Sequence, residues 1–285
     1  MQLELKSVSY TYARNTPHSS KAVSDVSLKI EAGEFIGIMG KTGCGKSTLL
    51  QLMAGLLDAE EGKVFLFDED INSKSYNRRK LRESVGVLFQ FPDYQLFETT
   101  VFRDVAFGLK HSGLKKSEVE AAVREAIELT GFDYSKVKDK SPLGFSGGEK
   151  RRLAMAGVLA VKPKILLLDE PVSGLDPSGR KELLQLLKRL NEGGTTIIMT
   201  SHNADVLAEY ASRIILMKNG KITADGDAED ILSDYDMLHK GGICAGQVKS
   251  IAKRLCDKGF DISEKTVKYN QLIDEICRVF GREDI

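Results

Sequence analysis

The chain has 285 residues, which is long enough to bury a sizeable core in one large domain or two. Its 41 Lys and Arg residues balance its 41 Asp and Glu residues, and this zero net charge argues against a surface that coats nucleic acid, although it allows a local basic patch. No apolar run can span a bilayer, and the first residues, MQLELK, lack a signal-peptide core. We therefore expect a cytoplasmic protein, whose four widely spaced cysteines stay reduced and form no metal pattern.

Two stretches near the start of the chain alternate apolar and polar side chains. Residues 1–12 alternate loosely and end in aromatic side chains, and residues 23–30 repeat the alternation after a polar loop. A period of two residues is typical of a strand with one buried face. The sequence therefore predicts an antiparallel β subdomain at the N-terminus.

Residues 40–48, GKTGCGKST, fit the pattern G-x-x-x-x-G-K-[ST] of a phosphate-binding loop. They follow an apolar run at 34–39, which predicts a buried strand, and precede leucines at helical spacing. Glycines let several backbone N–H groups face one point, and the start of the next helix adds its own unpaired N–H groups. We predict a site for the β- and γ-phosphates of a nucleotide, formed by Gly40, Lys41, Thr42, Gly43, Cys44, Gly45, Lys46, Ser47 and Thr48.

Three side chains add further chemistry to this predicted site. Lys46 brings a full positive charge to the phosphates, and the Ser47 hydroxyl is a ligand for Mg²⁺. Tyr12, at the end of the first predicted strand, is a candidate to stack on the base of the nucleotide. A core or edge tyrosine is an equally good interpretation of that residue.

The segment after the phosphate loop contains two further predicted strands, at residues 61–67 and 84–89. The second strand ends at Gln90. Residues 91–97, FPDYQLF, then interrupt regular structure at a proline and carry an unusual number of aromatic side chains. These side chains are either buried or part of a partner surface.

Two helical segments follow, each with the spacing of a capping box. The first lies within residues 101–131 and has Ser117 and Glu120 at that spacing. The second opens at FSGGE, with Ser146 and Glu149 at that spacing, and runs to about residue 160. An ordinary capped helix and a second phosphate-contacting helix start both fit this pattern. The candidates for phosphate contact are Ser146, Gly147 and Gly148.

Residues 164–170, KILLLDE, form an apolar run without polar alternation, as expected of a strand inside a parallel sheet. The run ends in Asp169 and Glu170, at the edge where open α/β sheets bind ligands. Asp169 is placed to hold Mg²⁺, usually through water. Glu170 is placed to orient or deprotonate an attacking water.

Two more signals follow the acidic strand. Asp176 and Pro177 have the order of a helix cap and a first-turn proline, and they precede a leucine-rich helix. Residues 195–200 predict a strand beside the acidic one, and His202 follows it. We favour a contact between His202 and the γ-phosphate over a purely structural role.

The sequence predicts an α/β protein in two parts. Residues 1–232 form a nucleotide-binding domain with a core of mainly parallel strands and an antiparallel β subdomain. Residues 233–285 form a small C-terminal helical extension, which begins with a polar, glycine-containing linker at 233–242. Its two short helices cannot hold a core alone, so we expect them to pack on the main domain or on another chain.

The order of these motifs resembles that of the ATP-binding cassette (ABC) ATPases. This resemblance implies a P-loop NTPase (RecA-like) core with a helical signature subdomain at about 91–160. The phosphate loop, Gln90, FSGGE, LLLDE, SGLD and Ser-His follow one another in the family's order over about residues 1–230. The family's signature is usually LSGGQ, so Phe145 and Glu149 replace its outer residues while the Ser-Gly-Gly centre is intact. We therefore expect a competent signature.

A narrower resemblance is to the A components of energy-coupling factor (ECF) transporters, which import vitamins and transition-metal ions. It rests on FQFPDYQLF at 89–97, on TVFRDVAFG at 100–108 and on the tail after Asp234. In those ATPases the C-terminal extension helps to hold two subunits together. The aromatic version of the first segment looks like the second ATPase of the heterodimeric modules.

The resemblance implies that two subunits meet head to tail around ATP and Mg²⁺. Ser47, Gln90 and Asp169 would serve Mg²⁺. Glu170 would activate water, and His202 would sense the γ-phosphate. The residues that would act across the interface, in the partner's site, are Ser146, Gly147, Gly148 and Asp176.

The resemblance also implies partners and a location. The partners would be a second ABC ATPase (a heterodimer is favoured, a homodimer possible), a transmembrane T component that docks near the aromatic loop and, indirectly, substrate-binding S components. Asp93 and Glu98 lie where basic residues of the T component could dock, or are simply solvated. The chain would be peripheral, at the cytoplasmic face of the cell membrane, without a nucleic-acid partner.

The alternative functions are weaker fits to the sequence. A soluble ABC ATPase that acts on nucleic acid or ribosomes usually carries a coiled-coil insertion, a zinc motif or a second cassette, and this chain has none of them. A P-loop kinase or GTPase does not need the FSGGE and SGLD motifs. A catalytically inactive subunit does not need both Glu170 and His202.

Overall fold

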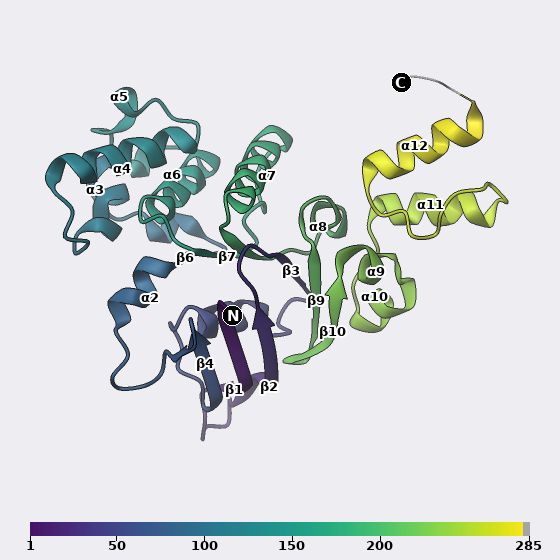
Figure 1. The fold of residues 1–285 in the computed structure, drawn as a ribbon, viewed down its shortest axis with the longest axis horizontal. Coiled ribbons are helices and arrows are strands. Elements are labelled where there is room, and N and C mark those ends of the chain that lie inside the picture. Colours follow the sequence, from purple (N-terminus) through teal and green to yellow (C-terminus); the bar gives the residue numbers. More distant parts are fainter. Residues whose placement is uncertain (282–285) are drawn as a thin grey trace.

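The computed structural model describes residues 1–281, apart from the side chains of residues 92 and 93. Within these residues the strands form two sheets (Figure 1). The smaller sheet has the strand order β2-β1-β4-β5 and is antiparallel, as predicted for the N-terminal β subdomain. Its strands are β1 (Leu3–Tyr12), β2 (Ser20–Ile30), β4 (Glu61–Leu66) and β5 (Glu69–Asp70).

The larger sheet has the order β10-β9-β3-β8-β7-β6, and its strands run parallel except for β10 at one edge. Parallel pairing brings the carboxyl ends of the strands to one edge, where the loops that follow β3, β6, β7 and β8 meet. The strands are β3 (Phe35–Met39), β6 (Val85–Leu88), β7 (Ile165–Asp169), β8 (Thr196–Thr200), β9 (Arg213–Lys218) and β10 (Lys221–Asp227).

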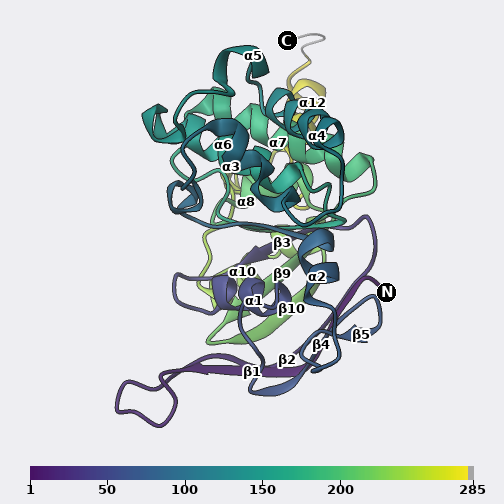
Figure 2. The same ribbon diagram turned by 90° about the vertical axis from the view of Figure 1, so that its left-hand side faces the viewer.

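The larger sheet is the middle layer of the molecule (Figure 2). Alternate side chains of its strands enter different clusters: Ile36 and Ile38 of β3 pack with helix α1 (Lys46–Met53) and the antiparallel sheet. Phe35 and Met39 pack on the opposite side, in a cluster shared with the helices. Because both faces are covered, β3, β7 and β8 are wholly buried, which explains why their sequences are apolar without alternation.

The helices on that opposite side gather in a lobe at one end of the sheet and above its middle (Figure 1). The lobe contains α3 (Val101–Ala106), α4 (Lys116–Leu129), α5 (Tyr134–Val137) and α6 (Gly147–Leu159). Helices α7 (Pro177–Glu192) and α8 (Ala204–Tyr210) lie beside it, and α2 (Arg78–Ser84) precedes β6. Short 3₁₀ turns cover Pro92–Gln95, Phe107–Leu109 and Pro142–Gly144.

One capping prediction in this lobe was wrong. The helical segment within residues 101–131 is divided into α3 and α4, and α4 begins two residues earlier than predicted. Its cap is Lys115, whose backbone N–H donates to the Glu118 carboxylate at 2.6 Å, in place of the predicted pair Ser117 and Glu120. Spacing alone did not distinguish these registers, because Glu118 and Glu120 both follow a polar residue by three positions.

The C-terminal part projects from the core sheet (Figure 1). It contains α9 (Ala228–Ser233), α10 (Tyr235–Gly241), α11 (Gln247–Asp257) and α12 (Tyr269–Phe280). Most of the stretch predicted as a linker is therefore helix α10. Helices α11 and α12 enclose a small separate cluster formed by Val248, Ala252, Ile262 and Leu272.

Several hydrogen bonds tie these helices to the main body. The Asp205 carboxylate of α8 accepts the N–H groups of Gln247 and Val248, at 2.8 and 3.1 Å. The backbone N–H of Tyr269, at the start of α12, donates to the Glu209 carboxylate of α8 at 2.8 Å. Among the helices of residues 1–281, none is both long and apolar enough to cross a bilayer.

Candidate nucleotide-binding site

The predicted phosphate loop connects β3 to α1 at the carboxyl edge of the larger sheet. Gly45, which precedes α1, has a φ of 108°, and a Cβ there would lie 2.2 Å from the carbonyl oxygen of Ala22. Only glycine fits this position. No side chain within residues 1–281 caps α1, so the amides of its first turn remain available to an anion.

Lys46 is held inside this loop. Its side chain is only 6% exposed, and its Nζ donates to the carbonyl oxygens of Gly40 and Lys41 at 2.8 and 3.3 Å. The loop backbone thus fixes a positive charge where the first-turn amides of α1 point. The same loop contains Cys44, and burial raises the pKa of its thiol, which keeps the thiol neutral.

A cavity of about 280 Å³ lies over the loop and brings together residues from distant parts of the chain. Many of the predicted site residues line it: Tyr12, Thr42, Gly43, Gly45, Lys46, Ser47, Thr48, Gln90, Asp169, Glu170 and His202. It is also lined by Ser20, Lys21 and Ala22, at the start of β2, which sequence analysis missed. The close approach of Ala22 to Gly45 places that strand over the loop, and no local sequence pattern indicates this approach.

Asp169 and Glu170, at the end of β7, are both hydrogen-bonded to a threonine that sequence analysis also missed. Thr200 ends β8 and pairs in register with Asp169 of β7. Its hydroxyl donates to Asp169 Oδ1 at 2.7 Å and accepts the backbone N–H of Glu170 at 2.9 Å. The predicted adjacency of the two strands is confirmed, and it explains how one hydroxyl orients both acids.

Glu170 is buried, with 9% of its surface exposed, and has a φ of 49°, a left-handed conformation that is uncommon for glutamate. Its Oε1 lies 3.1 Å from His202 Nε2, but it has no hydrogen-bond partner within the described residues. Burial raises the pKa of the Glu170 carboxyl, while the charges of His202 and Lys46 oppose that rise. Because Glu170 lines the cavity, its carboxylate is well placed to accept a proton from a water bound there.

The oxygen groups in the cavity fit a magnesium ion. Ser47 and Asp169 both line it and offer a hydroxyl and a carboxylate, which are ligands that this ion accepts. Within residues 1–281 no group of three or more His, Cys, Asp or Glu side chains gathers. Mg²⁺ uses one or two protein ligands and completes its shell with water and phosphate oxygens, so the Ser47 hydroxyl and the Asp169 carboxylate fit its needs.

The signature residues do not line this cavity. Ser146 caps α6, and its backbone N–H donates to the Glu149 carboxylate at 2.9 Å, so the predicted capping box is confirmed. Gly147 is exposed, and a Cβ there would meet no atom within 4 Å. Asp176 caps α7 by accepting the N–H of Gly179 at 3.3 Å and is also exposed.

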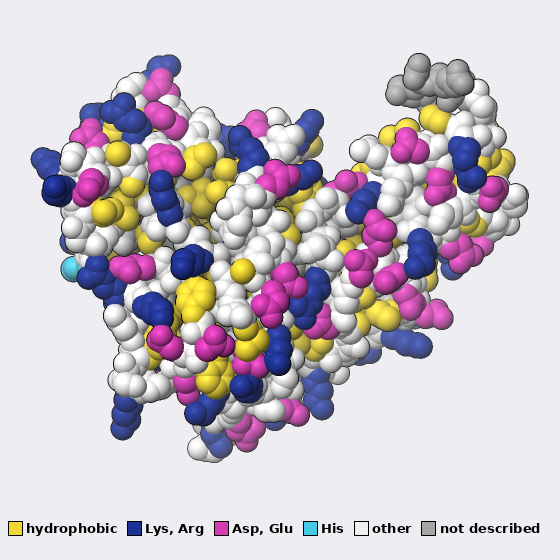
Figure 3. Space-filling model, viewed as in Figure 1, with side chains coloured by type: hydrophobic (Ala, Val, Ile, Leu, Met, Phe, Trp, Pro, Cys, Tyr) yellow, Lys and Arg dark blue, Asp and Glu magenta, His cyan; other side chains and the backbone are white. Residues whose placement is uncertain are grey.

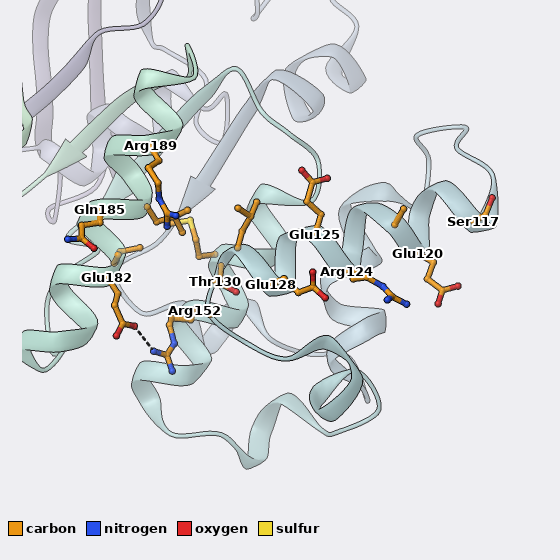
Figure 4. A pocket seen from close by; sticks show the side chains of 16 residues that line it. Ser117, Glu120, Arg124, Glu125, Glu128, Thr130, Arg152, Glu182, Gln185 and Arg189 are labelled. Atoms are coloured by element: carbon orange, nitrogen blue, oxygen red, sulfur yellow. Dashed lines mark hydrogen bonds and ion pairs between the residues drawn. The ribbon is translucent and has the colours of Figure 1, made fainter.

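The molecule also has a larger hollow, and it is a separate feature. A groove of about 900 Å³ runs between α4, α6 and α7 (Figure 4). Its floor includes Met155, Leu183 and Leu186, and the pair Arg152–Glu182 closes across it at 3.3 Å. Apolar side chains are visible in the hollow between the helical lobe and α7 (Figure 3). None of the predicted site residues lines this groove.

Comparison with known proteins relates the cavity to a family. Residues 23–173 match the family model of the ABC transporter domain. The chain is 41% identical to the energy-coupling factor transporter ATP-binding protein EcfA2 of Clostridium tetani, over 99% of each chain. It is 42% identical to the protein of that name from Clostridioides difficile, over 98% of each chain.

Solved structures agree with the sequence relatives. CbiO1 of Clostridium perfringens, part of the ABC transporter complex cbiONQ, superposes with a TM-score of 0.71 at 35% identity, over 84% of this chain and 93% of that one. The dimeric ATP-binding cassette MJ0796 bound to ADP and Pi gives a TM-score of 0.71 at 29% identity, over 79% of this chain and 98% of that one. The chain therefore belongs to the ABC transporter family of ATPases and, within it, to the ATP-binding proteins of energy-coupling factor transporters.

Proposed function

We propose that this chain is the ATP-hydrolysing subunit of an ECF importer, which powers the uptake of a vitamin or transition-metal ion. The observation that carries the proposal is the meeting of the phosphate loop, Asp169, Glu170 and His202 in one cavity at the carboxyl edge of the sheet. Similarity to EcfA2 proteins over nearly the whole chain supports the transport role.

The phosphate loop grips the β- and γ-phosphates of ATP. Lys46, already fixed by two backbone carbonyls, neutralises phosphate charge, and the first-turn amides of α1 donate hydrogen bonds.

Tyr12 stacks on the adenine at the edge of the cavity. Its hydroxyl lies 3.2 Å from Thr48 Oγ1 and 3.3 Å from Gln51 Oε1, and these contacts hold the ring beside α1.

Ser47, Gln90 and Asp169 would hold Mg²⁺, with Asp169 acting through water. The ion, when bound, supplies positive charge to the phosphate oxygens as negative charge shifts toward the leaving group. The Thr200 hydroxyl donates to Asp169 Oδ1, so the other carboxylate oxygen would serve the ion through its water.

Glu170 is the general base. Its carboxylate accepts a proton from the water that attacks the γ-phosphorus, the bond from phosphorus to the bridging oxygen breaks, and ADP and phosphate result. The raised pKa of Glu170 makes it a stronger base than an exposed glutamate. His202, in contact with Glu170 at 3.1 Å, holds this carboxylate and contacts the γ-phosphate.

The second half of each active site comes from a partner ATPase. Ser146, Gly147, Gly148 and Asp176 are solvent-facing and lie outside the chain's own cavity, as required of residues that act on the partner's ATP. A heterodimer with a second ABC ATPase is the favoured assembly.

Residues 1–232 form the nucleotide-binding domain, with its helical subdomain at about 91–160. Residues 233–285 form an extension that contributes to dimerisation through exposed apolar side chains of α11 and α12.

The aromatic segment at 91–97 forms the surface for the membrane T component, to which S components bind in turn. Phe91, Tyr94 and Phe97 are 63%, 88% and 60% exposed, which favours a partner surface over the alternative of burial. Glu98 is partly exposed beside them, whereas the side chain of Asp93 lies outside the described residues. This contact places the chain at the cytoplasmic face of the membrane.

The enzymatic part is tested by Glu170→Gln. The variant should lose turnover by at least about 100-fold and accumulate as an ATP-bound dimer, because the base is lost while the phosphate grip is intact. Gel filtration with ATP and a phosphate-release assay measure both effects. Glu192→Gln, at the exposed end of α7, is the matched control. Persisting hydrolysis in Glu170→Gln would remove Glu170 from its role.

The transport part is tested by co-purification of the tagged chain from its native membranes in mild detergent. We expect a second cassette ATPase, one transmembrane protein and several substoichiometric membrane proteins. Recovery with ribosomes or nucleic acid from the soluble fraction would contradict the transport role and leave the ATPase chemistry standing.

A further inference from the structure

One arginine of the signature helix reaches both loops that carry the proposed catalytic groups. Arg151 lies five residues after Ser146, near the start of α6. Its Nη2 donates to the carbonyl oxygen of Gln90 at 3.0 Å. Its Nη1 donates to the carbonyl oxygen of Pro171 at 2.9 Å, and also contacts the carbonyl oxygens of Glu170, at 3.5 Å, and Ser173.

These carbonyls belong to two loops that leave the sheet side by side. Gln90 follows β6 and Glu170 follows β7, and these strands pair in parallel from Val85–Ile165 to Leu88–Leu168. Beyond the sheet, neither loop has strand pairing to fix it. The planar fork of one guanidinium, with a nitrogen directed to each loop, supplies a link that the sheet does not provide there.

The Glu170 loop needs such support because its backbone is strained. A glutamate at a φ of 49° lies in the left-handed region, which is unfavourable for a residue with a side chain. The Thr200 hydroxyl holds the N–H side of this residue at 2.9 Å. Arg151 holds the carbonyls that follow it, so the strained turn is fixed from both ends.

We infer that Arg151 is a positioning residue that joins the signature helix to the loops of Gln90 and Glu170. In the proposed dimer the start of α6 contacts the partner's ATP, whereas Gln90 and Glu170 act on the chain's own ATP. Arg151 therefore transmits engagement of one nucleotide site to the catalytic groups of the other. The anchoring of the loops stands on the contacts alone, and the link between sites rests on the proposed function.

The neighbouring Arg152 provides a matched comparison. It has the same charge on the same helix, but its guanidinium pairs with Glu182 of α7 at 3.3 Å, across the groove drawn in Figure 4. It also lies over the ring of Phe132, at 5.1 Å. Removing Arg152 therefore removes a charge and an interhelical contact without touching either loop.

Hydrogen–deuterium exchange on the full chain without nucleotide tests the anchoring. In the wild type the Glu170 amide donates to the Thr200 hydroxyl, and the Ser173 amide donates to the Glu170 carbonyl oxygen. In Arg151→Met these two amides, and those around Gln90, should exchange about tenfold faster than in the wild type. In Arg152→Met they should exchange at the wild-type rate. Equal exchange in wild type and Arg151→Met, or equal acceleration in both variants, would overturn the inference, whatever the enzyme's activity.

Steady-state kinetics and equilibrium ATP binding test the link to catalysis. Arg151→Met should lower kcat by about 30-fold or more while the ATP dissociation constant changes less than about threefold, because the phosphate loop is untouched. Arg151→Lys should recover only part of kcat, since an ammonium cannot bridge both loops as a planar fork does. A parallel loss of ATP affinity, or full rescue by lysine, would contradict the positioning role.

Discussion

Two helices of this protein begin at glycine-rich motifs, and their starts differ in ways that define their tasks. Helix α1 starts at Gly45, without a side-chain cap, inside the chain's own cavity and next to a buried lysine. Helix α6 starts at Ser146, with a complete capping box, on the open surface. The first start is suited to hold an anion by itself, whereas the second satisfies the amides of Ser146 and Glu149 and would offer only part of a site.

The glutamates associated with the two sites also lie in contrasting environments: Glu170 lines the chain's own cavity, and Glu149 lies at the start of α6. Burial raises the pKa of Glu170, which has no hydrogen-bond partner for Oε1 within the described residues. Hydrogen bonds from the backbone N–H and the hydroxyl of Ser146 lower the pKa of Glu149. Its surroundings thus suit Glu170 for the proposed proton transfer, whereas Glu149 remains a fixed negative charge at the start of α6.

The largest expected effect is at the α1 start. Lys46→Met should weaken ATP binding by about 100-fold, or about 3 kcal/mol, because it removes the one charge that the loop backbone fixes toward the phosphates. Isothermal titration with ATP measures the change. Lys188→Met, on the exposed face of α7, should bind as the wild type does. If Lys46→Met bound ATP normally, α1 would not be the phosphate-holding start.

A second effect concerns pH. Because Glu170 is the proposed base and its pKa is raised, turnover should be complete above that pKa and should fall with acid at a midpoint above about 4.3, the value of an exposed glutamate. The raised pKa also means that the folded state loses stability as pH rises through it. Glu170→Gln should therefore raise the melting temperature more at pH 8 than at pH 4, as measured by calorimetry. The reverse order would argue against a destabilising buried carboxylate.

The smallest effect is expected at the α6 start. Glu149→Gln should lower the ATP concentration needed for half-maximal hydrolysis by about two- to fivefold, because a negative charge near the partner's incoming phosphates is removed. The lost acidic cap should cost about 0.5 kcal/mol of stability. Glu118→Gln removes the equivalent cap of α4 and is the control. A similar kinetic gain in that variant would show that α6 has no special relation to ATP.

The parts of the site that the sequence predicted are those carried by local patterns. The phosphate loop needs particular residues within nine positions, and the LLLDE run shows burial and acidity together. Thr200 and Arg151 were not predicted, because their roles depend on the order of strands in the sheet and on where α6 packs. The aromatic segment illustrates an intermediate case: its composition was noticed, but only the structure shows that its rings are exposed.

The two hydrogen bonds of the Thr200 hydroxyl have a fixed donor and acceptor order. A backbone N–H can only donate, so the Glu170 amide occupies a lone pair of the hydroxyl oxygen, and the single hydroxyl proton must point to Asp169. Asp169 Oδ1 is thereby obliged to be an acceptor in every turnover. The Glu170 backbone N–H thus fixes the direction of both hydrogen bonds, and the proposed proton transfer at the Glu170 side chain would leave the hydrogen bond to Asp169 unchanged.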